Sequence, residues 1–470
     1  MTGLTPAAVA FVLAASLAPS AAPPDRLPWL GHGAQVDPGF GYYKDRSPES
    51  IADEIAVNGY KVVHYVVTND GAVSAPLVEA FRRRGIGVWY LTFGNGTYST
   101  AGLPDGWESW RMVTRSDLAG TPLQDGYTRF CLNNPAYRAW KKASMAAVLR
   151  KHRFLGVEIA EPHWPEYPGI TAPAYACFCR HCKAAFTKTY PDEPELPDII
   201  DPASSRHPDR NPALWRKWLA FRASSLNAFL NDLVNGAGGL RASSPGRKVC
   251  TWTLALLGPD GMRRVLEDSG EDAAEVVRLV KPDVHCLQTH WPDWLRPELK
   301  GDYVLGYRPF LDGIRKVAPR LPVIVQGDIG SQKQNRRSWE WIRLFERTCD
   351  NMGAQGSQMY EYFIGGYMYD EPPRIAAASR SGDTVRLSFT KRLDPRSAGQ
   401  VSAYALSRGT VQAADVDGSV VTLRVAGLPR SGTVKITARG ISDASDRRLF
   451  NDKPPRTLIG QTVTVTGMQR

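Results

Sequence analysis

Four cysteines occupy two short segments of this chain, and their spacing suits a metal ion. Cys131 begins the run Cys-Leu-Asn-Asn-Pro-Ala-Tyr-Arg, whereas Cys177, Cys179 and Cys182 follow one another closely. Thiolates spaced C-x-C-x2-C can converge on one tetrahedral zinc, and a fourth thiolate from a distant segment can complete the site. A C-x-C pair is too tight to form a disulfide with itself comfortably, which favours zinc. A four-cysteine site has no open position for water, so the zinc is expected to be structural.

Carboxylates end three apolar runs, and carboxylates serve as general acids, bases and nucleophiles. The run that starts at Phe154 ends with Glu161 and contains Glu158 three residues earlier. Two later runs end with Asp328 and with Glu361. Side chains alternate between the two faces of a regular strand, so Glu158 and Glu161 are expected to face opposite sides unless a bulge changes the register.

The two cysteine segments resemble those of glycoside hydrolase family 42, the zinc-bearing β-galactosidases of the large retaining (β/α)8 clan. Those enzymes carry Tyr-Cys-Pro-Asn-Ser-Pro-x-Tyr-Arg, then a strand ending in Asn-Glu, then Cys-x-Cys-x2-Cys-x3-Phe. Residues 130–138 and 177–186 match the outer two segments. The middle segment departs, because no Asn-Glu pair occurs in this chain and Ala160-Glu161-Pro162 stands where it is expected. The resemblance therefore implies the fold more firmly than the substrate.

The resemblance also implies roles for the carboxylates, because the clan takes them from the ends of strands four and seven. Glu161 would be the acid that protonates the leaving oxygen, and Asp328 the nucleophile, about 5–5.5 Å away in a retaining enzyme. Glu361 is the alternative nucleophile if the strand count is wrong by one, and Glu158 is the alternative acid/base. Asp328 also fits a loop-capping carboxylate, and Glu161 a structural or substrate-binding group.

Aromatic, imidazole and amide side chains recur on or just after the predicted strands. Such residues suit a sugar, because the apolar faces of sugars pack on rings while amides bind hydroxyl groups. Each residue alone is more often part of a core, and the recurrence on several strands is what favours a binding site. The expected substrate-binding residues are His32, Asn69, Trp89, Trp252, His290, Trp291, Tyr360 and Tyr362.

The elements that must position these residues alternate between apolar runs and helical patterns from 27 to 372, which predicts a parallel sheet. Eight strands favour a TIM (β/α)8 barrel, and no Gly-x-Gly-x-x-Gly follows the first strand to support a doubly wound sheet. Strands are predicted at 29–36, 61–67, 87–93, 155–161, 249–256, 284–289, 323–328 and 357–362. Helices are predicted at 51–58, 76–84, 135–151, 212–235, 267–280, 309–317 and 338–352.

The pattern changes from 373 to 470, where short runs such as 384–389 and 420–425 alternate with period two between turn clusters. Such runs predict a C-terminal β-sandwich. The sequence of this region resembles the bacterial Ig-like modules appended to extracellular enzymes. We expect a spacer or a stabilising lid.

The first residues predict export. Residues 7–18 are apolar and small, and prolines and alanines follow them, which is typical of a secretory signal peptide at 1–22. The segment 1–6 carries no Lys or Arg, and an uncleaved tail is the alternative. No later run has the roughly 18 uninterrupted apolar residues that a spanning helix requires. A secreted or cell-surface protein without a membrane anchor is expected.

Net charge bears on the kind of partner, and cysteine count on whether disulfides form the framework. The net charge of +11 permits binding to polyanions, but the positive residues are scattered and not interleaved with aromatics, so nucleic acid is not an expected partner. Seven cysteines, an odd number, argue against a pure disulfide framework. Cys250, Cys286 and Cys349 lie in apolar runs and are predicted to be buried thiols.

These observations favour a secreted, retaining, β-galactosidase-like glycoside hydrolase acting on an oligosaccharide or polysaccharide. The alternative is a non-catalytic carbohydrate-binding protein on a decayed barrel. A hydrolase that uses the cysteine-bound zinc directly is disfavoured by its closed ligand set. The sequence leaves the sugar, the linkage and the oligomeric state open.

Overall fold

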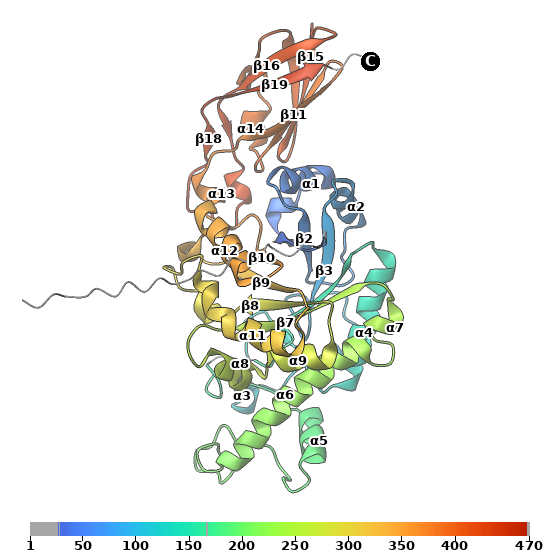
Figure 1. Cartoon of the computed structure of the whole chain (residues 1–470), viewed down its shortest axis with the longest axis vertical. Helices are drawn as coiled ribbons and strands as arrows, with labels where there is room; N and C mark the ends of the chain where they lie inside the picture. Colours follow the sequence, from blue (N-terminus) through green and yellow to red (C-terminus); the bar gives the residue numbers. More distant parts are fainter. Residues whose placement is uncertain (1–26, 28, 166–167, 468–470) are drawn as a thin grey trace, which may run out of the picture.

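The computed structural model describes residues 27, 29–165 and 168–467, so the expected signal peptide at 1–22 lies outside the described residues. Eight parallel strands close into a barrel in the order β1-β10-β9-β8-β7-β6-β3-β2. The barrel lies below the C-terminal antiparallel strands in Figure 1. The first strand pairs with the last, with His32 opposite Ser357 and Ala34 opposite Met359. The predicted TIM (β/α)8 barrel is confirmed.

All eight predicted strands exist, with their ends displaced by three residues or fewer. The apolar runs were a reliable signal because both faces of these strands are covered, one by barrel-interior side chains and the other by helices. The strands are β1 (His32–Val36), β2 (Val62–Val67), β3 (Gly87–Phe93), β6 (Gly156–Ala160), β7 (Lys248–Ala255), β8 (Val284–Thr289), β9 (Val323–Asp328) and β10 (Gly356–Tyr360).

Helices surround the barrel, and local capping explains several of their ends. Asn134 accepts hydrogen bonds from the backbone N–H groups of Ala136 and Tyr137, and a proline follows it at the first helical position. The main helices are α1 (Pro48–Val57), α2 (Ala75–Arg83), α4 (Pro135–Lys151), α5 (Arg180–Thr189), α6 (Pro212–Asn235), α8 (Gly261–Ser269), α9 (Ala273–Val280), α11 (Arg308–Val317) and α12 (Trp339–Met352). No helix among the described residues is long and apolar enough to cross a membrane.

The single helix predicted at 267–280 is wrong. The chain there ends α8 and begins α9, because Gly270 adopts a left-handed conformation with φ 70°. Asp272 then caps α9 by accepting a hydrogen bond from the backbone N–H of Glu275. A glycine at the end of a helix followed by an Asp cap is the sequence signal for this break.

After the barrel, antiparallel strands form two larger sheets, and β17 (Ile441–Ser442) pairs separately with β18 (Thr457–Leu458). The first, in the order β11-β12-β15-β14, consists of β11 (Ile375–Ser381), β12 (Thr384–Phe389), β15 (Val420–Ala426) and β14 (Thr410–Asp417). The second consists of β13 (Tyr404–Leu406), β16 (Gly432–Ala438) and β19 (Gln461–Gly467). Leu387 and Leu423 of the first sheet share one buried core with Val434 and Ile436 of the second. This arrangement fits the predicted β-sandwich, whereas its Ig-like relationship stays a prediction.

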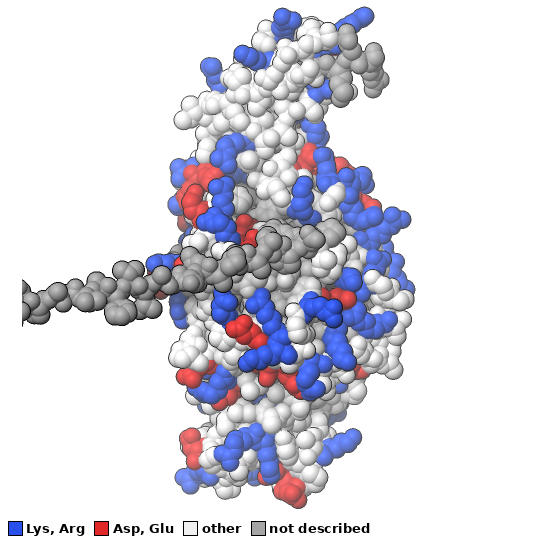
Figure 2. Space-filling model, in the orientation of Figure 1, with Lys and Arg blue, Asp and Glu red and all other residues white. Residues whose placement is uncertain are grey.

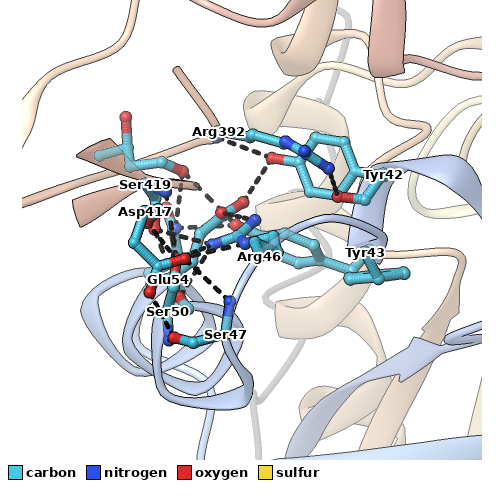
Figure 3. Close-up of polar contacts among 12 residues, drawn as sticks. Tyr42, Tyr43, Arg46, Ser47, Ser50, Glu54, Arg392, Asp417 and Ser419 are labelled. Atoms are coloured by element: carbon cyan, nitrogen blue, oxygen red, sulfur yellow. Dashed lines mark hydrogen bonds and ion pairs between the residues drawn. The ribbon is translucent and has the colours of Figure 1, made fainter. Parts of the chain in front are cut away.

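A polar interface joins the sandwich to α1 of the barrel (Figure 3). The Arg46 side chain is fully buried, with Nη1 2.7 Å from Oε2 of Glu54. Its Nη2 also donates to Oγ of Ser419 in the sandwich at 3.0 Å. The backbone N–H of Ser47 donates to Oδ1 of Asp417 at 2.8 Å. Side chains of the sandwich thus complete the first turn of α1 and the loop before it.

A second set of contacts ties the sandwich to the loop after β1. The backbone N–H of Arg392 donates to the Tyr42 hydroxyl at 3.0 Å, and its Nη1 donates to the Tyr42 carbonyl at 2.6 Å. Asp53 of α1 accepts hydrogen bonds from Arg386 and Ser388 of the sandwich. Charged side chains elsewhere are dispersed, and Figure 2 shows Lys and Arg interspersed with Asp and Glu on the face in view.

Candidate active site

A pocket of about 270 Å³ opens at the carboxyl ends of the barrel strands. Reactive groups in TIM-barrel enzymes lie at this end, on the strand termini and the loops that follow. The last residues of β3, β6, β9 and β10 all contribute to its wall. The lining residues are Gln35, Val66, Leu91, Phe93, Tyr98, Ala160, Glu161, Trp252, Gln288, Trp294, Gln326, Asp328, Ser331 and Tyr360.

Glu161 follows β6 and faces this pocket because of its backbone conformation. Its φ is 51°, a left-handed value that is uncommon for a residue other than glycine. Ala160 and Glu161 therefore both line the pocket, although consecutive residues of an extended strand would face opposite sides. Nε2 of Gln288, on β8, donates to Oε1 of Glu161 at 3.0 Å and orients the carboxylate.

Asp328 ends β9 and faces the same pocket. Its Oδ1 accepts hydrogen bonds from the backbone N–H groups of Gly330 and Ser331, each at 2.9 Å, and its Oδ2 accepts one from the Ser331 hydroxyl. Burial raises the pKa of Asp328, while these hydrogen bonds act in the opposite direction. Asp328 is thus a loop cap and a pocket residue at once, so both sequence interpretations of it describe real contacts.

Glu158 lies in the barrel interior and is not among the residues that line the pocket. Its Oε2 accepts hydrogen bonds from Nε1 of Trp252 and Nε2 of Gln358, both at 3.0 Å, and its Oε1 contacts Nδ1 of His64. Trp252 does line the pocket. Glu158 therefore fixes a wall of the pocket, and the idea that it exchanges roles with Glu161 is not supported by its position.

Glu361 follows β10 but turns away from the pocket. Its side chain is fully buried, with Oε1 accepting a hydrogen bond from the Tyr43 hydroxyl at 2.5 Å and Oε2 one from the backbone N–H of Asp37 at 2.6 Å. Burial raises its pKa well above the usual range. These contacts hold the loop that follows β1, so the structure does not place the alternative nucleophile with Glu161.

Two of the eight expected substrate-binding residues, Trp252 and Tyr360, line the pocket. Contrary to expectation, His32 lies at the opposite end of the barrel, because it begins β1, and its Nδ1 is 2.8 Å from Oγ of Ser357. Trp89 also lies toward that end, where its Nε1 donates to the Trp29 carbonyl at 3.1 Å. Residue type suggested that both bind substrate. The position along the strand, however, decides at which end of the barrel a side chain lies.

The other four expected residues lie near the barrel's carboxyl end but outside the pocket lining. Asn69 lines a separate cavity beside α4, where its Oδ1 accepts from the backbone N–H of Gly71. Tyr362 is buried toward the sandwich, with its hydroxyl accepting from Nδ2 of Asn58 at 2.9 Å. His290 and Trp291 begin the turn after β8, and burial lowers the pKa of His290 to about 3.

Several pocket residues were missed by the sequence reasoning. Three glutamines, Gln35, Gln288 and Gln326, each stand near the carboxyl end of a strand, next to apolar residues, and that contrast was the available signal. Oε1 of Gln326 is buried without a hydrogen-bond partner among the described residues. Trp294, in the short helix α10 (Trp291–Trp294), takes the place expected for Trp291.

The four cysteines predicted to bind zinc converge outside this pocket. Their sulfur atoms all lie within 4.8 Å of one another, and all four side chains are buried. The Cys131 sulfur is 3.4 Å from that of Cys179 and 3.5 Å from that of Cys182. Thiolates around a tetrahedral zinc with Zn–S bonds of about 2.3 Å stand about 3.8 Å apart, so the four residues fit that ion.

Backbone amides surround the cysteine cluster, as suits a thiolate-rich site. The backbone N–H of Val113 donates to the Cys177 sulfur, and that of Asn133 to the Cys131 sulfur, each at 3.4 Å. The cluster fastens the segments that precede α4 and α5 to one another. The remaining cysteines, Cys250, Cys286 and Cys349, are buried free thiols, as predicted.

No family model matches the chain, and no curated protein matches it. Among solved structures, Gan42B, a GH42 β-galactosidase, is 15% identical with a TM-score of 0.50, covering 72% of this chain and 53% of that one. The β-galactosidase from Rahnella sp. R3 is 15% identical with a TM-score of 0.49, covering 73% and 53%. The PgaB (BpsB) glycoside hydrolase domain from Bordetella bronchiseptica is 14% identical with a TM-score of 0.49, covering 70% and 94%.

The matched region spans about half the length of the two β-galactosidases. At such identities the likeness to Gan42B establishes the barrel fold alone. What the pocket does must therefore be argued from its own residues.

Proposed function

We propose that this protein is a glycoside hydrolase that cleaves a bond in an oligosaccharide or polysaccharide. One observation carries the proposal: two carboxylates, Glu161 and Asp328, line the same aromatic pocket. Glu161 follows the fourth strand of the barrel and Asp328 ends the seventh, both at its carboxyl end. Glycosidases of the usual kind need two carboxyl groups flanking the scissile bond.

In the proposed mechanism Asp328 is the nucleophile. Its ionised carboxylate attacks the anomeric carbon as the bond to the leaving oxygen breaks, giving a glycosyl ester. The donors from Gly330 and Ser331 favour the ionised form against the effect of burial. Attack requires one of these hydrogen bonds to loosen, and the Ser331 hydroxyl, which can rotate, is the group suited to do so.

Glu161 is the proposed acid/base. It gives its proton to the leaving oxygen in the first step and takes a proton from water in the second, when that water hydrolyses the ester. The left-handed backbone at Glu161 turns the carboxyl group into the pocket, and the amide of Gln288 orients it. The indole of Trp252 and the ring of Tyr360 supply apolar faces for the sugar, and Oε1 of Gln326 supplies an acceptor for a hydroxyl group.

A non-catalytic carbohydrate-binding protein is the second candidate, and one observation favours it. Both oxygens of Asp328 already accept hydrogen bonds from the turn that follows β9. A carboxylate engaged in this way can hold a loop without attacking a sugar. The pocket would then bind a saccharide and leave it intact.

Two further parts of the proposal concern the rest of the chain. Cys131, Cys177, Cys179 and Cys182 hold a structural zinc, since all four ligand positions are taken by thiolates and none of them lines the pocket. Residues 1–22 act as an export signal, which suits an enzyme of extracellular saccharides, so the mature protein is secreted or at the cell surface.

The test compares leaving groups. A panel of nitrophenyl glycosides first identifies the sugar, after which Glu161→Gln should slow substrates with poor leaving groups by about 10²–10⁴-fold. Activated aryl glycosides need little proton assistance, so their first step should be nearly unchanged, and azide should rescue their second step. Asp328→Asn should abolish turnover of both kinds. Asp209→Asn, the same change at a side chain that is 89% exposed, is the control.

Saccharide binding without turnover of any glycoside would support the second candidate. Equal losses on both leaving-group classes in Glu161→Gln, without azide rescue, would remove Glu161 from the acid/base role.

A further inference from the structure

A short two-stranded antiparallel sheet outside the barrel carries an aromatic ring to the rim of the pocket. It consists of β4 (Gly96–Thr97) and β5 (Thr128–Arg129), with Thr97 opposite Thr128. Tyr98 follows β4 and Tyr127 precedes β5, and their ring centroids are 4.6 Å apart. We call these two tyrosines and the two strands the aromatic arm.

Tyr98 is exposed although it belongs to the pocket lining. Its side chain is 62% accessible, the only aromatic among the large hydrophobic residues that are exposed in the described part of the chain. Its ring is packed against Phe93 at 5.7 Å as well as against Tyr127. An aromatic ring that packs on two others and is still largely exposed is suited to stack on the apolar face of a sugar.

The arm leaves room for Tyr127 by using a glycine. A Cβ atom added to Gly96 would lie 2.0 Å from the Tyr127 hydroxyl oxygen, which no side chain could tolerate without displacing the ring. The hydroxyl end of Tyr127 therefore lies directly over the backbone of the opposite strand. This packing fixes the ring on which Tyr98 rests.

The arm lies on the same side of the pocket as Glu161. Phe93, the last residue of β3, is opposite Ala160, and the backbone N–H of Gly94 donates to the Ala160 carbonyl at 2.6 Å. Glu161 is the next residue. Burial and then the charge of Glu161 raise the pKa of Tyr127, as expected of close neighbours. Under the proposed function Glu161 protonates the leaving oxygen, so the leaving group must lie on this side.

Resting on that proposed function, we propose that Tyr98, supported by Tyr127, is the stacking platform for the first sugar of the leaving group. The substrate class is therefore a chain of two or more sugars, and not a single sugar attached to a small non-sugar group. The sugar to be attacked enters the pocket, while its neighbour in the chain lies on the exposed Tyr98 ring at the rim.

The experiment compares two substrates that share the sugar in the pocket and differ in the leaving group. The leaving group of a glycosyl fluoride is fluoride, which cannot stack on a ring. The leaving group of the matching disaccharide is a sugar. The first pair is β-galactosyl fluoride and β-1,4-galactobiose, with the corresponding pair for another sugar if the glycoside panel identifies one. Both are measured as kcat/KM.

Tyr98→Ala should lower kcat/KM for the disaccharide about five- to tenfold and change that for the fluoride less than twofold. Tyr98→Phe should keep both values near those of the parent, because the ring and not the hydroxyl makes the contact. Leu305→Ala, at a side chain that is 49% exposed and outside the pocket lining, is the matched control and should change neither.

Equal losses on both substrates in Tyr98→Ala would overturn the proposal, as would a Tyr98→Phe variant as impaired as Tyr98→Ala. In either case the proposed function would stand, because the fluoride and the disaccharide are still hydrolysed by the parent. Failure of the parent protein to hydrolyse any glycoside would overturn the proposed function and the platform together.

Discussion

Replacing Arg46 with methionine tests how strongly the buried ion pair at the junction with the sandwich stabilises the barrel. The Arg46 guanidinium is completely buried, where it pairs with Glu54 and donates to Oγ of Ser419 and to the Ser50 carbonyl at 3.0 and 2.9 Å. Methionine fills similar space but removes the charge. The Glu54 carboxylate is 1% exposed. Of its hydrogen bonds to described residues, it would keep the one from the Tyr42 hydroxyl.

The expected loss is large because one member of a buried ion pair is left without its partner. Removing one partner of such a pair typically lowers the free energy of unfolding by about 3–5 kcal/mol. That is a substantial share of the roughly 5–15 kcal/mol by which a domain is stable. Arg424→Met is the matched control, because Arg424 pairs with Asp415 at 3.8 Å and both side chains are about two-thirds exposed.

The assay uses the distribution of tryptophan in the chain. All 13 tryptophans lie at or before Trp341, so their fluorescence reports unfolding of the barrel alone. Far-ultraviolet circular dichroism reports both parts. In urea the two signals of the parent should change together. In Arg46→Met the fluorescence midpoint should fall well below that of Arg424→Met, and the two signals should separate.

Unfolding curves of Arg46→Met that coincide with those of Arg424→Met would refute this reasoning. The buried Arg46–Glu54 pair in Figure 3 would then contribute little to stability.

Two further predictions concern the cysteine cluster and a buried carboxyl group. Cys179→Ser should release one zinc per chain, measured by elemental analysis, and lower the thermal midpoint, while the ratio of rates on good and poor leaving groups stays that of the parent; zinc-free parent protein purified without chelator would contradict it. The pKa of Glu361 is raised in the folded state, so folding takes up a proton there. The stability that this proton contributes is present below the unfolded pKa of about 4.3 and is lost as pH rises toward the folded value. Glu361→Gln, which mimics the protonated form, can still accept from the Asp37 N–H and donate to Tyr43, so its stability relative to the parent should increase from pH 4 to pH 7 in urea titrations; an unchanged difference would show that Glu361 does not titrate with unfolding.

The barrel could be predicted because its information is local. Each strand is an apolar run buried on both faces, and several helices carry their own cap, as Asn134 does for α4. The carboxylates that end strands four and seven followed from the strand count. The long helix 212–235 was likewise located to its exact ends, since its apolar face and its Asn211 cap are both visible in the sequence.

The composition of the pocket was harder to predict because it depends on backbone geometry that has no period. The left-handed φ at Glu161 turns that side chain into the pocket, against the alternation expected for a strand. Glu361 follows a correctly predicted strand, yet its side chain accepts a hydrogen bond from Tyr43 in the loop after β1 and does not enter the pocket. His32 has a residue type suited to a site but stands at the wrong end of its strand.

The pairing of β1 with β10 determines when, during synthesis, the molecule can be completed. His32 and Ser357 are 325 positions apart. Ribosomes add about 5–20 residues per second, so β10 is made roughly 15–65 s after β1. Its other edge can pair early with β2, but the edge meant for β10 exposes unpaired backbone groups throughout that time. Until β10 has been made the barrel cannot close, and the unpaired edge of β1 is a site at which a second chain can pair.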